Sequence, residues 1–210
     1  MNLLFDLDGT LTDPREGIVS CIKHALYTLR KPVPEDSELV KFIGPPLRAS
    51  FYDLLLSEED ADAAVAAYRD RFISLGIFEN AIYEGIPEAL EVLRTQGGRL
   101  FVATSKPRVF AERIIEHFGL GKHFSAIYGS ELDGKLSDKG ELVAYALASS
   151  KLAPNDTVMI GDRRHDIAGA LANGVFAAGV LWGYGSREEL TAAGAQKLYL
   201  RPNELEQIVV

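Results

Sequence analysis

Five short apolar runs constrain the fold of this 210-residue chain more than any other feature of the sequence. Most of them are apolar throughout rather than alternating, which is typical of strands covered on both faces, as in a parallel sheet. Helical patterns separate the runs, and Pro87, Pro107 and the Asp138/Glu141 pair provide helix starts. The alternation predicts an α/β, doubly wound parallel sheet. The five expected strands are Leu3–Phe5, Leu100–Ala103, Ala126–Tyr128, Thr157–Ile160 and Val175–Val180.

The stretch from Pro14 to Asn80 interrupts this alternation and contains helical patterns only. Ser57 precedes three consecutive acids, a composition that favours a helix start. We therefore predict a core formed by residues 1–13 and 83–210, with an all-helical domain inserted at residues 14–82. Two connections that leave and return close together suit a hinged lid over the strand ends. The alternative is a helical bundle fused rigidly to the sheet.

Composition narrows the class of protein and of partner. The chain is 47% hydrophobic and 25% charged with a net charge of -8, which is ordinary for a globular protein and disfavours a nucleic-acid polymer as partner. The one cysteine, Cys21, lies in a helical pattern as a small core residue, and a chain with one cysteine fits a reducing, cytoplasmic setting. We see neither a secretory signal nor a run near the ~20 apolar residues of a membrane span. We expect a small-molecule partner, no membrane, and a monomer or homodimer.

Two acids directly follow the first apolar run. Asp6 and Asp8 are separated by one residue and followed by Gly9 and Thr10, which turn the chain. Residues i and i+2 of an extended segment share a face, so both carboxylates point the same way. At about 4 Å they would repel by roughly 4 kcal/mol at an effective dielectric constant near 20. A cation, a shared proton or solvent must offset this repulsion; an acid pair in an exposed turn is the alternative.

Other polar residues follow the later strands. Thr104 and Ser105 end the second strand before a helix start, which is either an anion site or a helix cap. Lys139 occupies a helix start, where the dipole disfavours a positive charge. The residue therefore either faces an anion or is a solvated surface lysine.

The segment Ile160-Gly161-Asp162 again ends a strand in an acid, and Asp166 follows. If a helix starts here, Asp162 and Asp166 share a face at i and i+4; a helix cap with a solvated acid is the alternative. Ligands of open α/β sheets bind at the carboxyl ends of the strands. We therefore expect Asp6, Asp8, Asp162 and Asp166 to converge, and Mg²⁺ is the simplest ion to hold them. The four histidines are scattered and predict no zinc site.

These motifs, in this order, resemble the haloacid dehalogenase superfamily with a type 1 helical cap. Asp6-Leu7-Asp8-Gly9-Thr10 is similar to the first motif of that family, Thr104 to the second, Lys139 to the third, and Gly161 to Asp166 to the fourth. The likeness spans almost the whole chain and implies a Rossmann-like core with a helical cap inserted after the first motif. Many relatives carry Lys-Pro-x-Pro at the third motif, which this chain lacks, so Lys135 rivals Lys139.

The resemblance also implies a mechanism. Asp6 would attack phosphorus and form an aspartyl-phosphate, while Asp8 would protonate the leaving alcohol and then deprotonate the hydrolytic water. Thr104 and Lys139 would hold the phosphoryl oxygens. An acid at position 8 points to phosphoryl transfer, because family members that dehalogenate lack it.

The resemblance implies a metal site and a substrate class as well. The Asp6 carboxylate, the Asp8 carbonyl and Asp162 would bind Mg²⁺, with Asp166 in support. Gly9, Thr10 and Ser105 are further expected substrate contacts. Arg48 is expected either to meet a second charge of the substrate or to be a solvated arginine at a helix end.

The finer likeness concerns the substrate. The turn at Gly44-Pro45-Pro46 resembles a branch that includes 5′-nucleotidases, and Tyr83 to Pro87 resembles phosphoglycolate phosphatases. We predict a Mg²⁺-dependent phosphomonoesterase of small phosphometabolites, leaning to nucleoside 5′-monophosphates. The alternatives are a phosphatase of phosphoglycolate or another small organic phosphate, a phosphosugar mutase, and a catalytically silent binding module.

Overall fold

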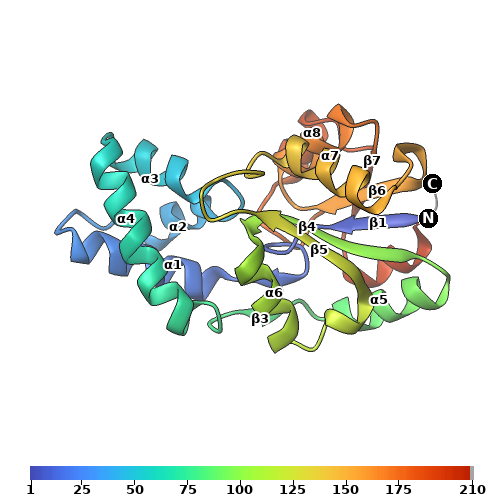
Figure 1. The fold of residues 1–210 in the computed structure, drawn as a ribbon, viewed down its shortest axis with the longest axis horizontal. Helices are drawn as coiled ribbons and strands as arrows, with labels where there is room; N and C mark the ends of the chain where they lie inside the picture. The colour runs from blue at the N-terminus through green and yellow to red at the C-terminus, as the bar shows by residue number, and fades with distance from the viewer. Residues whose placement is uncertain (209–210) are drawn as a thin grey trace. The chain divides into compact units, whose positions relative to one another are not determined.

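The computed structural model of the chain describes residues 1–208 and contains two compact units (Figure 1). The first unit joins Met1–Asp13 to the part of the chain that begins at Ile82, and the second is Pro14–Ala81. The predicted role of the second unit as a cap or lid stays a prediction.

A six-stranded sheet forms the centre of the first unit, in the order β5-β4-β1-β6-β7-β8. Every neighbouring pair in this sheet is parallel, which confirms the predicted fold class. The sequence did not predict β8, because this strand is only three residues long and contains no sustained apolar run. The strands are β1 (Asn2–Phe5), β4 (Arg99–Pro107), β5 (Phe124–Ser130), β6 (Thr157–Gly161), β7 (Phe176–Val180) and β8 (Lys197–Tyr199).

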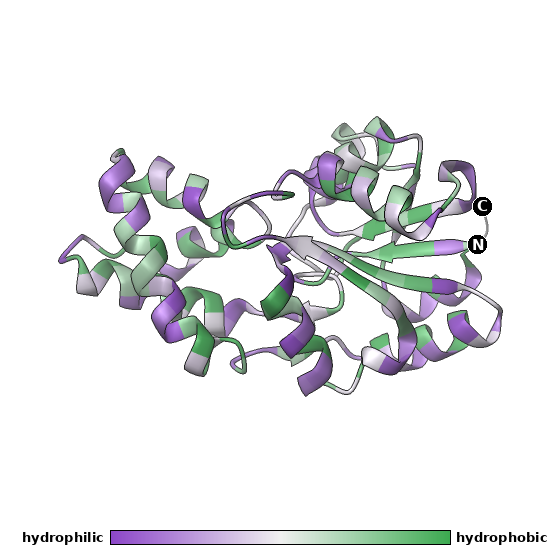
Figure 2. Ribbon diagram, viewed as in Figure 1, coloured by the Kyte–Doolittle hydropathy of each residue, from purple (hydrophilic) through white to green (hydrophobic). Residues whose placement is uncertain are grey.

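Helices cover both faces of this sheet, and Figure 2 shows the apolar strands between them. On one face Leu4 pairs in register with Phe101 and Met159, and these side chains are buried in one cluster with residues of α7 and α8. The helices α5 and α6 lie on the opposite face (Figure 1). Burial on both faces explains why the strands are apolar throughout. The helices of this unit are α5 (Ile86–Thr95), α6 (Arg108–His117), α7 (Lys139–Ser150), α8 (Arg164–Ala172) and α9 (Arg187–Ala192), with short 3₁₀ turns at Gly121–His123, Pro154–Asp156 and Pro202–Gln207.

The strand order positions the polar residues that the sequence singled out. β1 lies between β4 and β6, so the residues that end these three strands lie at one edge of the sheet. The backbone amide of Asp6 donates a hydrogen bond to the carbonyl of Ile160 at 2.9 Å, which continues the pairing of β1 with β6 past the last residue of β1. Asp6, Thr104 and Asp162 are therefore brought to the same edge.

The second unit spans Pro14–Ala81. Its regular elements are helical, except that Ala81 belongs to the short strand β3. Ser57 caps α4 by accepting a hydrogen bond from the amide of Asp60 at 3.2 Å, as its sequence predicts. Cys21 is buried on α1, as expected of a small core residue. The elements are α1 (Arg15–Thr28), α2 (Asp36–Leu39), a 3₁₀ turn (Val40–Phe42), α3 (Leu47–Leu55), α4 (Glu58–Arg71) and a π-helical turn (Phe72–Gly76). The short strands β2 (Thr12–Asp13) and β3 (Ala81–Ile82) pair with each other.

Across residues 1–208, none of the helices combines the length and the apolar character needed to cross a bilayer.

The start of α7 supplies a first prediction. Asp138 is the N-cap, and its Oδ1 accepts a hydrogen bond from the amide of Glu141 at 3.0 Å. Replacing it with alanine leaves this amide without its partner, so we expect Asp138→Ala to lower the free energy of unfolding by about 1 kcal/mol. Asp138→Ser keeps an acceptor and is the matched control. Equal losses in urea unfolding for both variants would contradict this account of the cap.

Candidate active site

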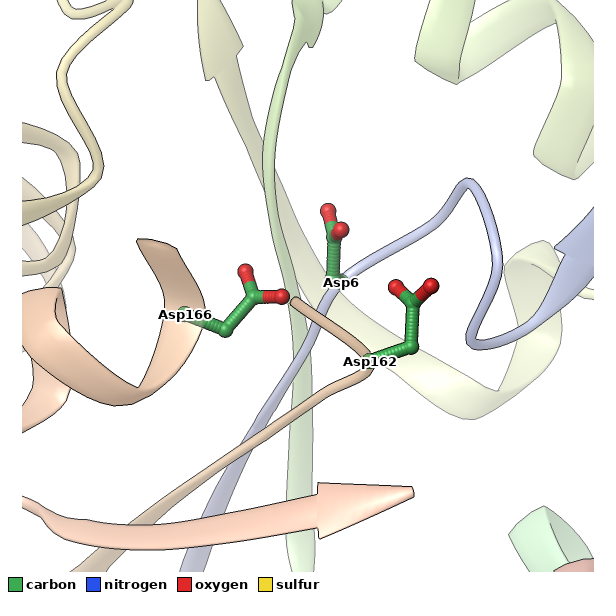
Figure 3. Close-up of side chains that lie close together, drawn as sticks. All are labelled: Asp6, Asp162 and Asp166. Carbon is green, nitrogen blue, oxygen red and sulfur yellow. The ribbon is translucent and has the colours of Figure 1, made fainter. Parts of the chain in front are cut away.

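Three buried acids meet at the carboxyl edge of the sheet. Asp6 follows β1, Asp162 follows β6, and Asp166 lies in the first turn of α8 (Figure 3). One carboxylate oxygen of each lies within 4.8 Å of those of the other two. Of the four acids that the sequence analysis expected to converge, these three form the group, and the Asp8 carboxylate is not part of it.

Asp162 is held by two neutral donors. It is fully buried, and its oxygens accept hydrogen bonds from Thr10 Oγ1 at 3.4 Å and from the backbone amide of Tyr184 at 2.8 Å. Gly9 makes this approach possible, because its φ is +83° and a Cβ there would lie 2.3 Å from Asp162 Oδ2. Burial, and then the charges of Asp166 and Asp6, hold the pKa of Asp162 well above its usual range.

The helix that carries Asp166 begins later than the sequence suggested. α8 starts at Arg164, so Asp162 precedes the helix and does not form an i, i+4 pair with Asp166. The two acids approach instead because Asp166 turns back toward the strand end, where its Oδ2 accepts a hydrogen bond from the amide of Arg163 at 3.0 Å. Burial raises the pKa of Asp166 to about 6, although Lys139 opposes the increase.

Lys139 lies among these acids. It is the first residue of α7, and its Nζ lies 3.0 Å from Asp6 Oδ1 and 2.7 Å from Asp166 Oδ1. It also donates a hydrogen bond to the carbonyl of Ala103 at 3.0 Å. Burial would lower the pKa of this ammonium, but Asp166 and Asp6 outweigh burial and the pKa is raised. The rival Lys135 is exposed and pairs with Asp133 at 2.9 Å.

Asp8 has a cation of its own, which sequence reasoning missed. The Nζ of Lys106 lies 2.5 Å from Asp8 Oδ2, and both side chains are largely buried. Burial raises the pKa of Asp8, although the charge and the hydrogen bond of Lys106 oppose this. Spacing gave no clear signal: Lys106 follows Thr104 by two residues in β4, but the register of β4 with β5 shifts between Thr104 and Pro107, so strand alternation does not fix where Lys106 points.

Thr104, Thr10 and Ser105, which the sequence analysis expected to contact the substrate, make hydrogen bonds within the protein. Thr104 is buried, and its Oγ1 accepts a hydrogen bond from the amide of Lys106 at 3.3 Å. Thr10 is fully buried and donates to Asp162, while the carbonyl of Ser105 accepts from Ser130 Oγ at 2.8 Å.

Arg48 lies on α3 in the second unit, where its guanidinium pairs with Glu58 at 2.5 Å and Asp62 at 2.6 Å. These two carboxylates belong to the same unit as Arg48, so a contact between Arg48 and a substrate stays a prediction.

The charges of the first unit's site fit a hard divalent cation. The four carboxylates are Asp6, Asp8, Asp162 and Asp166, and the ammonium groups that pair with three of them belong to Lys106 and Lys139. Two unit charges at 4.8 Å repel by about 3 kcal/mol at an effective dielectric constant near 20. When all four carboxylates are ionised, two additional positive charges neutralise this set, and clustered carboxylate oxygens are the ligands that Mg²⁺ prefers.

The repulsion among these acids predicts that a neutral residue at position 162 stabilises the metal-free protein. Asparagine can still accept a hydrogen bond from Tyr184 and introduces no charge. We expect Asp162→Asn to stabilise the protein in EDTA by about 1–3 kcal/mol, or roughly 2–10 °C in Tm, and to reduce the further increase that Mg²⁺ causes. Asp156→Asn, at an exposed acid in the 3₁₀ turn before β6, is the control.

The gain from Asp162→Asn depends on pH. An acid whose pKa is raised by folding costs stability as pH rises from its usual range through the raised value. The gain in EDTA should therefore be larger at pH 7.5 than at pH 5.5. A destabilised variant, or a gain that grows toward acid, would contradict the repulsion.

Comparison with known proteins assigns this chain to a family. The family described as haloacid dehalogenase-like hydrolase matches residues 3–180. A 5′-nucleotidase of Pseudomonas aeruginosa is 51% identical over 192 residues, which are 91% of this chain and 87% of that protein. The tyrosine-protein kinase PtkA of Mycobacterium tuberculosis is 44% identical over 183 residues, which are 87% of this chain and 62% of that protein.

Solved structures agree with the sequence relatives. The crystal structure of a predicted phosphatase from Clostridium acetobutylicum superimposes with a TM-score of 0.94 at 47% identity, covering 98% of this chain and 96% of that one. Phosphoglycolate phosphatases are among the more distant sequence relatives. The resemblance carried by the four motifs is confirmed: the chain belongs to the haloacid dehalogenase-like hydrolase family.

Proposed function

We propose that this protein is a Mg²⁺-dependent phosphomonoesterase that hydrolyses nucleoside 5′-monophosphates through an aspartyl-phosphate on Asp6. The buried cluster of Asp6, Asp162, Asp166 and Lys139 is the observation that carries this proposal. The ammonium group beside the Asp6 carboxylate, together with a cation held by the acids, would neutralise the negative charge of a phosphoryl group under attack. The P. aeruginosa relative, at 51% identity, supports the choice of nucleotides.

The first half of the reaction transfers the phosphoryl group to the protein. A carboxylate oxygen of Asp6 attacks phosphorus while the bond from phosphorus to the ester oxygen breaks. The ester oxygen leaves with the proton of the Asp8 carboxyl, so the product is a neutral alcohol. Lys139, which contacts Asp6, and the hydroxyl of Thr104 hold the phosphoryl oxygens during the transfer.

The second half returns Asp6 to its starting state. Asp8, now ionised, accepts a proton from a water molecule whose oxygen attacks phosphorus. The bond from phosphorus to Asp6 breaks, and inorganic phosphate is released. Asp8 is again protonated, and its raised pKa favours the protonated form that the first half requires.

The metal site would use the Asp6 and Asp162 carboxylates and the backbone carbonyl of Asp8, with Asp166 in support. When bound, Mg²⁺ supplies two positive charges that offset the carboxylates and the incoming phosphate. The second unit is proposed as a cap that selects the substrate, with Arg48 as the residue that meets a second substrate charge.

A panel of phosphomonoesters tests the substrate class. We expect kcat/KM to be higher for nucleoside 5′-monophosphates than for phosphoglycolate or sugar phosphates, and EDTA to abolish phosphate release. Asp6→Asn removes the nucleophile and should lower kcat by about 10³-fold or more, whereas Asp156→Asn should not.

Three results would redirect the proposal. A preference for phosphoglycolate would favour the alternative phosphatase, and an isomerised sugar phosphate would indicate a mutase. Phosphate transfer to a protein hydroxyl in place of water would match the relative named as a kinase. A wild type that releases no phosphate from any ester, with or without Mg²⁺, would exclude the enzyme.

The double role of Asp8 predicts a kinetic signature in Asp8→Asn. p-Nitrophenol leaves without a proton, so the variant should still phosphorylate Asp6 when given p-nitrophenyl phosphate. The next step needs a base for water, which asparagine does not supply. We expect a burst of about one equivalent of p-nitrophenol, followed by turnover about 10²–10⁴-fold slower than wild type.

Rapid acid quenching and intact-protein mass spectrometry should then find the Asp8→Asn chain carrying one phosphoryl group. Asp6→Asn/Asp8→Asn is the control and should show no burst. Slow turnover by Asp8→Asn without a burst would contradict the assignment of water activation to Asp8.

A further inference from the structure

We propose that Lys106 is a positioning residue for this reaction, which holds the Asp8 carboxyl by one oxygen and leaves the other to exchange protons with the leaving group and water. The inference rests on the proposed function of Asp8 and adds a residue to it. No motif used above assigns Lys106 a role.

The contact between Lys106 and Asp8 is buried. The two side chains are 7% and 12% exposed, and the ammonium lies 2.5 Å from Asp8 Oδ2. The other oxygen, Oδ1, is also buried and has no hydrogen-bond partner among the described residues. A charge-assisted hydrogen bond therefore holds one oxygen of this carboxyl, and Oδ1 is the atom left for proton transfer.

The backbone fixes where Lys106 points. Pro107 follows it, which restricts Lys106 to extended conformations. Its amide donates to Thr104 Oγ1 at 3.3 Å, and the carbonyl of the preceding Ser105 accepts from Ser130 Oγ at 2.8 Å. β5 approaches closely at Gly129, where a Cβ would lie 2.7 Å from the carbonyl oxygen of Lys106. The backbone is therefore held in place on both sides of Lys106, which fixes the direction of its side chain.

The two buried lysines of the site contact different acids. Lys139 contacts Asp6 and Asp166, the nucleophile and a proposed metal support, whereas Lys106 contacts Asp8. Lys106 comes from β4 and Lys139 from α7, so the two lysines approach different acids from separate elements. This division predicts different defects when each is removed. Loss of Lys106 should affect the steps in which Asp8 moves a proton, and should leave binding of the phosphoryl group nearly unchanged.

Leaving groups of different basicity separate these steps. kcat/KM reports the reaction up to departure of the alcohol, and p-nitrophenol departs without a proton. We expect Lys106→Met to lower kcat/KM for p-nitrophenyl phosphate less than about 3-fold. For phenyl phosphate and a nucleoside 5′-monophosphate, which need the proton, the loss should be roughly 10–100-fold and should appear in kcat rather than in KM. Lys122→Met, at an exposed lysine of the same unit, is the matched control and should change neither value.

A double-mutant cycle tests whether Lys106 acts through Asp8. If it does, Asp8→Asn/Lys106→Met should match Asp8→Asn within about 2-fold in kcat/KM for every ester. Both charges of the pair are absent from the double variant, so this arm remains informative if Lys106→Met alone does not fold. Thermal melting and the Mg²⁺-dependent increase in Tm establish that each variant retains the site.

The outcomes distinguish this inference from the proposed function. Equal losses for all leaving groups, or additive losses in the double variant, would overturn the positioning role while wild type still hydrolyses phosphate esters. A higher KM with unchanged kcat would show that Lys106 binds the substrate directly. Absence of phosphatase activity in wild type would instead overturn the proposed function.

Discussion

The site depends on one electrostatic constraint: several acids are buried together at one edge of a parallel sheet, where their repulsion must be balanced. The order of the strands creates the problem, because β1 lies between β4 and β6 and each of these strands ends at that edge. Asp162 and Asp166 respond with raised pKa values, chiefly because burial disfavours their charged forms. Such a cluster destabilises the protein when no cation is bound and favours the binding of positive charge. Stability and chemistry are therefore linked through the same side chains.

The chain balances part of this charge with lysines that it supplies from different elements. Lys139 begins α7 and approaches Asp6 and Asp166, although the dipole of that helix disfavours a cation at its first residue. Its neighbour Asp138 caps the same helix and holds the position from which the lysine reaches in. The negative charge that the two lysines leave unneutralised equals the positive charge of one divalent cation. A bound phosphate ester adds further negative charge, which the lysines and the cation must also offset.

Much of the fold could be predicted from the sequence because strands buried on both faces are apolar throughout, and residues that end adjacent parallel strands meet. That reasoning brought Asp6 and Asp162 to one edge, whereas Lys139 was singled out because the dipole at a helix start disfavours its charge. It failed where the signal was short or depended on distant contacts. β8 has three residues, and α8 begins at Arg164 because Asp166 folds back on the amide of Arg163. Lys106 was missed because only the three-dimensional structure shows that its ammonium meets Asp8, 98 residues away in the chain.

The claim on which this account depends is that the acid cluster binds one divalent cation beside the nucleophile. Anomalous diffraction from crystals equilibrated with Mn²⁺, which accepts the same oxygen ligands as Mg²⁺, tests it most directly. The account predicts a single strong anomalous peak at the carboxyl edge of the sheet, coordinated by Asp6 and Asp162. A peak bound elsewhere in the molecule, or none at a Mn²⁺ concentration that saturates phosphate release, would contradict it.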